Sequence, residues 1–231
     1  MALPVVNSSK YSTVIPSTGV EVDYRPYLVK EEKILMIALE SKDQRQIMKA
    51  VKDVIEACVF DDINVDELAV FDIETLFLKL RSKSVGETAD LNAKCSECEH
   101  PHETQVNLEE IEVTGVDEDS KIIQVTDTIG VTMRYPTIGD FEAGTEGTEA
   151  ILQLMTKCMV NIFDNDNVYP CKDETRKSLT DFIDSLNSGQ FQKLAKFFQD
   201  LPALVHNIEF VCTKCEHENS IELKGIQSFF S

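Results

Sequence analysis

The chain contains one cysteine motif twice, first as Cys95-Ser-Glu-Cys98-Glu-His100 and again as Cys212-Thr-Lys-Cys215-Glu-His217. A Cys-x-x-Cys turn can direct both of its sulfurs toward one metal ion at about 2.3 Å, and two such turns complete a tetrahedral shell of four thiolates. We therefore expect Cys95, Cys98, Cys212 and Cys215 to bind one zinc ion.

A site with four thiolate ligands keeps no open coordination position, so the expected zinc is structural and not catalytic. The long separation of the two motifs means that the site joins distant parts of the chain around an inserted region. Two redox-active motifs or disulfides are the alternatives, but the shared Glu-His context favours two equivalent halves of one site. Three histidines could replace a cysteine as ligand or lie behind the ligands: His100, His102 and His217.

The composition is that of a folded, strongly acidic protein. Of 231 residues, 42% are hydrophobic, and 22 basic residues stand against 41 acidic ones, for a net charge of −19. Contacts with nucleic-acid phosphates or an anionic membrane need clustered Lys and Arg, so we expect neither partner. The acidity instead favours solubility or a basic protein partner.

The sequence also bears on the compartment. It has no apolar run of about 18 residues and no basic segment followed by a long apolar stretch at its start, which indicates a protein made and kept in a cytosol. Three cysteines lie outside the paired motifs. Cys58 and Cys158 fall on apolar helical stripes and are expected in the core, whereas Cys171 is expected in a polar loop.

Residues 1–88 predict a β-hairpin followed by three helices. The hairpin spans residues 11–28 and turns at Pro16-Ser-Thr-Gly19. The helices are expected over residues 30–39, over an apolar stripe that runs from Ile47 to Cys58, and from Asp72 onward. Ser41-Lys-Asp-Gln44 resembles a capping box for the second helix, and Asp72 is the expected N-cap of the third.

Residues 89–231 predict a split zinc ribbon that carries a helical insertion. Strands are expected at residues 104–108, 205–211 and 220–223, a second hairpin at residues 121–135, and an exposed turn region at residues 109–119. Between about residues 137 and 204 the apolar period becomes helical, with one stripe running from Ile151 to Ile162 and another from Phe191 to Phe198. The predicted fold class is therefore α+β: an N-terminal β-hairpin with helices, then the split four-cysteine zinc ribbon with its helical insertion.

No catalytic signature accompanies these elements. The sequence has no P-loop, Rossmann glycine pattern, HExxH or Gly-x-Ser-x-Gly, and it contains only four histidines. We therefore do not expect an enzyme.

Five stretches together resemble the baseplate proteins of T4-like bacteriophages, in particular the hub subunits and hub-assembly factors. They are the two cysteine motifs, Ile15-Pro-Ser-Thr-Gly19, Tyr24-Arg-Pro-Tyr-Leu-Val-Lys-Glu-Glu-Lys-Ile-Leu-Met36 and Leu223-Lys-Gly-Ile-Gln-Ser-Phe-Phe230. The resemblance implies a non-enzymatic role in the central hub of a contractile tail, with other hub proteins as partners. It leaves open whether the chain is a virion subunit or an assembly factor.

The same resemblance implies where the protein is found and which residues contact its partners. The protein is expected in the host cytoplasm during assembly, with the virion tail baseplate as the second location. Phe229 and Phe230, at the C-terminal end, are candidates for anchoring in a partner, since desolvated aromatic side chains dominate many interfaces. Packing on the protein's own core is the alternative for both.

Two other functions compete with this interpretation. A zinc-ribbon adaptor for nucleic acid or transcription needs a local basic face, but acidic side chains outnumber basic ones around the motifs: Glu97, Glu99, Glu216 and Glu218 against Lys94 and Lys214. A redox enzyme would oxidise its paired thiols reversibly without metal. Zinc content distinguishes this last alternative.

Overall fold

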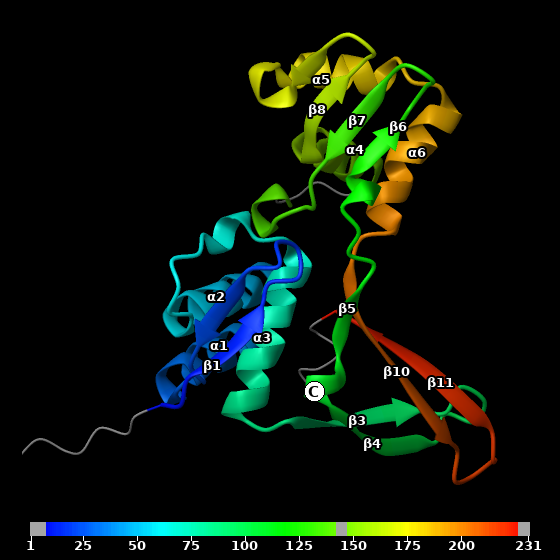
Figure 1. The fold of residues 1–231 in the computed structure, drawn as a ribbon. Coiled ribbons are helices and arrows are strands. Elements are labelled where there is room, and N and C mark those ends of the chain that lie inside the picture. The colour runs from blue at the N-terminus through cyan, green and yellow to red at the C-terminus, as the bar shows by residue number, and fades with distance from the viewer. Residues whose placement is uncertain (1–7, 142–146, 226–231) are drawn as a thin grey trace, which may run out of the picture. The chain divides into compact units, whose positions relative to one another are not determined.

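The computed structural model describes residues 8–141 and 147–225 of the chain, which divides into two compact units. Unit 1 combines Met1–Thr114 with Ala203–Ser231, and unit 2 is Gly115–Pro202 (Figure 1). The two ends of unit 2 therefore both connect to unit 1.

Unit 1 begins with the predicted hairpin and three helices. Strands β1 (Tyr11–Val14) and β2 (Glu21–Tyr24) pair antiparallel, and α1 (Val29–Ser41), α2 (Gln44–Cys58) and α3 (Val70–Ser84) follow. A single 3-10 turn, η1 (Val65–Glu67), precedes α3. The predictions for this segment are confirmed in element type and order.

Both predicted helix caps in this segment are wrong. Helix α2 is capped by Asp43, whose carboxylate accepts the Arg45 N–H, while Ser41 ends the preceding helix. Helix α3 starts before Asp72, which accepts hydrogen bonds from Ala69 N and from Ser17 of the N-terminal hairpin. The carboxylate of Asp72 therefore ties the hairpin to the helix, a role that depends on the tertiary structure.

The rest of unit 1 consists of two hairpins that carry the cysteine motifs. Strand β3 (Thr88–Lys94) pairs with β4 (Pro101–Asn107), and β10 (Ala203–Val211) pairs with β11 (Glu218–Lys224). A short strand, β5 (Glu112–Thr114), extends the second sheet to the order β11-β10-β5. We refer to these as hairpin A (β3 and β4) and hairpin B (β10 and β11).

The predicted exposed turn region at residues 109–119 is exposed along most of its length, but it is not a turn throughout. It contains β5 and parts of two 3-10 turns, η2 (Leu108–Glu110) and η3 (Asp119–Lys121), and Ile111 is buried. Glu109 accepts a hydrogen bond from Ser82 and pairs with Lys79 and Lys83 of α3. Glu109, the first residue of this acidic stretch, is therefore held against α3 by basic side chains.

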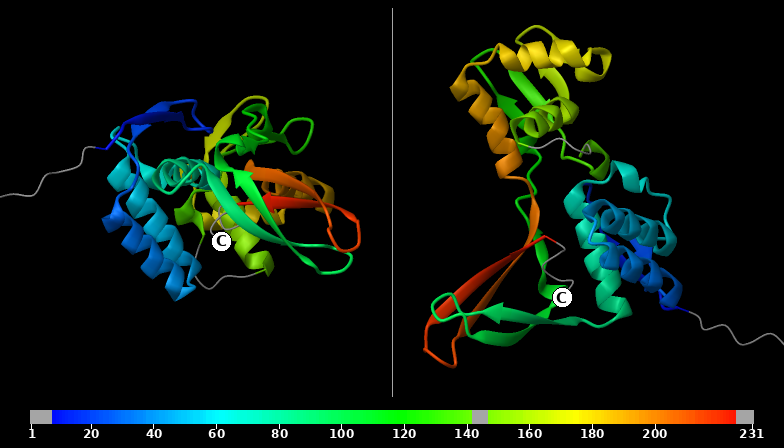
Figure 2. Two further views of the ribbon diagram at one scale, coloured as in Figure 1. Left: turned by 90° about the horizontal axis from the view of Figure 1, so that it is seen from below. Right: turned by 180° about the vertical axis from the view of Figure 1, so that it is seen from behind.

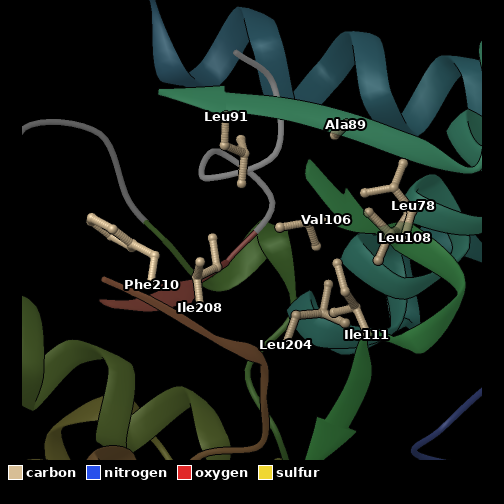
Figure 3. Packing of buried hydrophobic residues seen from close by; sticks show 9 residues of the cluster. All are labelled: Leu78, Ala89, Leu91, Val106, Leu108, Ile111, Leu204, Ile208 and Phe210. Atoms are coloured by element: carbon tan, nitrogen blue, oxygen red, sulfur yellow. The ribbon is translucent and has the colours of Figure 1, made fainter. Parts of the chain in front are cut away.

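A single apolar cluster joins the hairpins to the N-terminal helices. Figure 3 shows side chains from α3, from both hairpins and from the segment between them packed together. Its buried members are Leu78, Ala89, Leu91, Val106, Leu108, Ile111, Leu204, Ile208 and Phe210. Leu78 of α3 thus shares one core with hairpins A and B, all within unit 1. The predicted boundary at residue 88, between an N-terminal region and a zinc-ribbon region, stays a prediction.

Unit 2 contains more β-structure than the predicted helical insert. Strands β6 (Ile122–Gln124), β7 (Gly130–Met133), β8 (Met159–Phe163) and β9 (Val168–Pro170) form one antiparallel sheet in that order. The helices of this unit are α4 (Gly147–Cys158), α5 (Arg176–Asp184) and α6 (Ser188–Gln199). Two further 3-10 turns are η4 (Ile138–Asp140) and η5 (Cys171–Asp173).

Two predictions for the insert are wrong. The helical stripe from Ile151 to Ile162 ends at Cys158, because Met159 onward forms β8 and Ile162 pairs with Val131 of β7. Cys171 lies not in a polar loop but in η5, where it is buried. The expected burial of Cys58 and Cys158 is confirmed.

One local arrangement occurs in both units, and we call it the hairpin–arginine motif. In unit 1, Arg25 follows strand β2 and donates its backbone N–H to Cys58 O at 3.0 Å. Its Nη2 donates to Glu31 Oε1 and to Ala57 O, each at 2.9 Å. The arginine thus fastens the hairpin to the start of α1 and the end of α2.

Unit 2 repeats these contacts one by one. Arg134 follows β7 and donates its N–H to Cys158 O at 2.8 Å. Its guanidinium binds both carboxylate oxygens of Asp140 at 2.7 and 2.8 Å, and also Lys157 O at 3.0 Å. Like Glu31 in α1, Asp140 is the third residue of its helical turn and accepts the N–H of the cap residue.

The strand pairing and burial also correspond in the two motifs. Tyr24, directly before Arg25, pairs with Val59, and Met133, directly before Arg134, pairs with Met159. Equivalent positions are buried in both copies: Ile15 and Val125, Val22 and Val131, Tyr24 and Met133, and Cys58 and Cys158. The same backbone and core pattern is therefore built twice by different sequences.

Among the helices described, none is both long and apolar enough to span a membrane.

Candidate metal centre

Hairpins A and B each end in a cysteine turn of the same conformation. In hairpin A, Cys95 N donates to His100 O at 3.0 Å, and Glu99 N donates to Cys95 O at 2.9 Å. Glu99 adopts a left-handed backbone with φ 55°, a conformation that lets the chain reverse directly after the second cysteine.

Hairpin B reproduces this turn. Cys212 N donates to His217 O and Glu216 N donates to Cys212 O, both at 2.9 Å, and Glu216 has φ 59°. In addition, Lys214 N donates to the Cys212 sulfur at 3.4 Å. The repeated Cys-x-x-Cys-Glu-His pattern thus corresponds to one local geometry, as the sequence predicted.

The structure brings the four cysteines of the two turns into one cluster. Their sulfurs all lie within 4.8 Å of one another. Cys95 Sγ is 3.6 Å from Cys215 Sγ, and Cys98 Sγ is 3.6 Å from Cys212 Sγ, so each close pair joins one hairpin to the other. Both views of Figure 2 show the tips of the two hairpins side by side.

These distances fit a metal shell better than disulfides. Four sulfurs at about 2.3 Å from a central ion are about 3.8 Å apart, close to the observed 3.6 Å. A disulfide requires about 2.05 Å between sulfurs, and all four cysteines are free. The cluster can therefore hold one metal ion with four thiolate ligands.

The hydrogen bonds around the sulfurs favour the thiolate form of two of the four cysteines. Burial alone would raise the pKa of Cys95, but N–H groups of Cys98 and Glu97, together with Asn219, lower it to about 6. The N–H groups of Cys215 and Lys214 likewise lower the pKa of Cys212. Two ligands, one in each turn, are therefore favoured as thiolates even before a cation approaches.

Cys215 differs from these two ligands. The backbone N–H of His217 lowers the pKa of Cys215, but hydrogen bonds to the other three sulfurs outweigh it and raise that pKa to about 12. Without a cation, four sulfurs this close cannot all carry a negative charge, so protons remain in the cluster. A divalent cation would replace those protons.

The residue that sequence reasoning missed is Asn219, which connects the two halves. Its side-chain oxygen accepts hydrogen bonds from Ser96 N at 2.8 Å and Ser96 Oγ at 3.0 Å, and its Nδ2 lies 3.6 Å from Cys95 Sγ. Nδ2 also donates to His217 O at 3.0 Å. Asn219 is buried, so these contacts satisfy a polar group that water cannot reach.

His102 occupies the matching place in hairpin A. It pairs across the hairpin with Ala93 as Asn219 pairs with Phe210, and its ring stacks on Phe210 of hairpin B at 4.3 Å. Each hairpin therefore reaches into the other from the same register position. The sequence signal was present in the equal spacing of these two residues from their cysteine turns, but nothing in it showed what they contact.

The other candidate residues lie elsewhere. Among the described residues, the metal-ligating cluster consists of the four cysteines and includes no histidine. Burial raises the pKa of Cys58 to about 11 and that of Cys158 to about 12, which makes both thiols poor nucleophiles. Phe229 and Phe230, the predicted partner contacts, lie outside the described residues.

Comparison with known proteins gives two matches. The family model described as T4 bacteriophage base plate protein matches residues 8–231. The baseplate hub assembly protein gp26 of Enterobacteria phage T4 is 23% identical over 210 residues, which cover 90% of this chain and 92% of that protein. No solved structure matches.

Proposed function

Because the chain belongs to the family of T4 bacteriophage base plate proteins, we propose that it is a structural or assembly protein of the central hub of a contractile tail baseplate. The observation that carries this proposal is the similarity to a hub assembly protein along nearly the full length of both chains. The residues that the family model matches include both cysteine motifs and the whole of unit 2. The role is one of binding and positioning other proteins, without catalysis.

The proposed cofactor is one structural Zn²⁺, held by Cys95, Cys98, Cys212 and Cys215. The cross-hairpin sulfur distances of 3.6 Å support it, as does the all-sulfur donor set, which suits zinc. With four protein ligands, the ion would contribute folding free energy and no open coordination position. The complete proposal for this part of unit 1 is a split zinc ribbon.

Such an ion would serve the hub by fixing hairpins A and B to one another. Both hairpins share the apolar cluster with α3, so restraining their tips also restrains the sheets that enclose that cluster. Gly115–Pro202 is inserted between β5 and β10 of the same sheet. The metal would therefore hold together the part of the protein from which unit 2 emerges.

Two finer assignments belong to the same proposal. The partners are other baseplate hub proteins, and Phe229 and Phe230 are candidate contacts with them. The competing adaptor for nucleic acid is not favoured, because a net charge of −19 repels phosphates and the cysteine turns carry mainly acidic neighbours.

The experiment that tests the role compares purified phage particles with hub intermediates from the same infection by quantitative mass spectrometry. Presence of the chain in mature particles supports a structural subunit. Presence in intermediates alone supports an assembly factor that leaves before completion. Absence from both would refute the hub proposal, and an abundant particle protein measured in the same samples controls for recovery.

A further inference from the structure

The two hairpin–arginine motifs differ by one helix. In unit 1, Glu31 lies in the first turn of the 13-residue helix α1, which leads to α2. In unit 2, the equivalent Asp140 closes the single turn η4, and only residues 141–146 separate it from α4. That segment is too short for a helix of the length of α1.

Unit 2 therefore shows that the motif forms without such a helix. All contacts of the arginine, from the backbone bond to Cys158 to the carboxylate pair with Asp140, are present there. The part of α1 beyond its first turn is thus an addition to the motif in unit 1. An added helix whose outer side is apolar calls for a separate explanation.

The inner and outer sides of α1 are both apolar. Leu35 and Ala38 are buried on the inner side, where α1 packs against α2. On the outer side, Val29 is 64% exposed, Met36 56% and Ile37 69%. Further exposed apolar side chains flank them: Leu28, Ile34 and Leu39. Single exposed apolar residues are ordinary, but a group of this size on one helix marks an interaction surface.

The charges on this outer side have a particular order. Lys33 and Glu40 lie one turn before and one turn after the central pair Met36 and Ile37. Both are exposed, and within the described residues neither takes part in an ion pair. The sequence Lys-x-x-Met-Ile-x-x-Glu is therefore complementary to itself when read in the opposite direction.

We propose that this surface binds the same surface of a second copy of the chain, with the two α1 helices antiparallel. A two-fold axis that passes between Met36 and Ile37 places Met36 of each copy against Ile37 of the other. It also brings Lys33 of each copy opposite Glu40 of the other, giving two identical ion pairs at the edges of an apolar centre. This is the isologous arrangement of a symmetric dimer.

The size of the surface sets the expected strength. One pair of short helices buries less area than a standard stable interface, so the dimer forms reversibly and depends on concentration. The apolar centre supplies most of the affinity, while the two ion pairs select the antiparallel orientation. A parallel pairing would set Lys33 against Lys33 and Glu40 against Glu40.

Sedimentation velocity of the full chain over a wide concentration range tests the proposal with four variants. Ile37→Glu is expected to give a monomer at all concentrations. Lys33→Glu and Glu40→Lys each create two repulsive pairs and should weaken the dimer about tenfold, from about 0.7 kcal/mol per exposed pair. The double variant Lys33→Glu/Glu40→Lys restores opposite charges and should recover dimerisation. Lys49→Glu on α2 is the control for a charge change at an exposed position outside the surface.

A second measurement uses the unmodified protein and does not depend on the folding of any variant. A mixture of ¹⁴N- and ¹⁵N-labelled chains is treated with a carbodiimide, which couples lysine to carboxylate at contact distance. A Lys33–Glu40 cross-link between a light and a heavy chain is the expected product. A wild-type monomer at all concentrations, a dimer that ignores the charge reversals, or a double variant that fails to recover would each overturn the proposal.

Discussion

The side-chain oxygen of Asn219 accepts the backbone N–H of Ser96 at 2.8 Å, and this bond joins the two cysteine turns independently of any metal. The same side chain approaches Cys95 Sγ and binds His217 O, so one buried amide touches both halves of the cluster. The hairpins are thus held in register by the protein itself. A metal ion would bind to a site whose halves are already paired.

The Asn219→Ala variant is expected to lower stability with and without zinc. It leaves Ser96 N–H without its partner in a partly buried place, which costs about 1–3 kcal/mol. Urea unfolding at fixed zinc concentration measures the change. Asn207→Ala, at an exposed position of β10 in the same hairpin, is the matched control. Equal stabilities of the two variants would show that the cross-hairpin bond contributes nothing.

Replacing one ligand should remove the metal. Purified wild-type protein is expected to contain one zinc ion per chain by atomic emission, and Cys212→Ser should contain none, because three thiolates bind zinc far more weakly at a split site. Its melting temperature should fall to that of wild-type protein treated with a chelator. Cys171→Ala, which removes a cysteine of unit 2, should keep the full zinc content. Zinc in Cys212→Ser at the wild-type level would refute the assignment of this ligand.

The carboxylate pair of the second hairpin–arginine motif makes stability depend on pH. Burial by itself raises the pKa of Asp140, but the Arg134 guanidinium and the Thr137 N–H and hydroxyl hold it below its usual range. A carboxyl group with a lowered folded-state pKa stabilises the protein above its unfolded pKa of about 3.9, and this contribution is lost as pH falls through the lower folded-state value.

The Asp140→Asn variant tests this dependence. It should lose about 1–3 kcal/mol at neutral pH, less than a fully buried pair would cost, because Arg134 stays partly in water. Its stability should approach that of the wild type in acid, where the wild-type Asp140 is protonated and therefore as uncharged as the asparagine of the variant. Asp127→Asn, at an exposed turn between β6 and β7, controls for loss of a surface charge. A deficit that persists unchanged at low pH would contradict the charge-pair explanation.

Gly130 is expected to be intolerant of a side chain. A Cβ at this position would lie 2.2 Å from the Phe163 ring, which packs over the glycine from the neighbouring strand β8. Gly130→Ala should therefore destabilise unit 2 by about 1–3 kcal/mol through overpacking. Hydrogen exchange of β7 and β8 amides measures the effect within that unit.

Two further variants make the Gly130 prediction specific. Gly139→Ala should leave exchange nearly unchanged, since the nearest neighbour of its Cβ would be 3.8 Å away. Adding Phe163→Leu to Gly130→Ala should restore part of the protection by making room for the methyl group. If Gly130→Ala and Gly139→Ala behave alike, the close approach of the ring is not what constrains this strand.

Local sequence predicted the parts of the fold that local physics controls. The turn of hairpins β1/β2 and β6/β7, the helical stripes of α1, α2 and α3, and the repeated cysteine turn all depend on contacts between residues a few positions apart. The boundary near Cys158 was wrong for the same reason: an apolar run can continue a helix or begin a strand, and only the neighbouring strand β7 decided for β8. The role of Asp72 likewise depends on a residue brought to it by folding, Ser17, whereas the cap of α2 at Asp43 is a local contact.

The sequence by itself determined the four cysteines and their grouping into two equivalent turns, because a Cys-x-x-Cys spacing fixes the direction of both sulfurs within one turn of chain. Only the tertiary structure decided that the turns meet, that Asn219 and His102 cross between the hairpins, and that the arginine contacts of unit 1 recur in unit 2. Such contacts join side chains far apart along the chain, and their energies appear only once a shared core such as that of Leu78 and Ile208 brings them together.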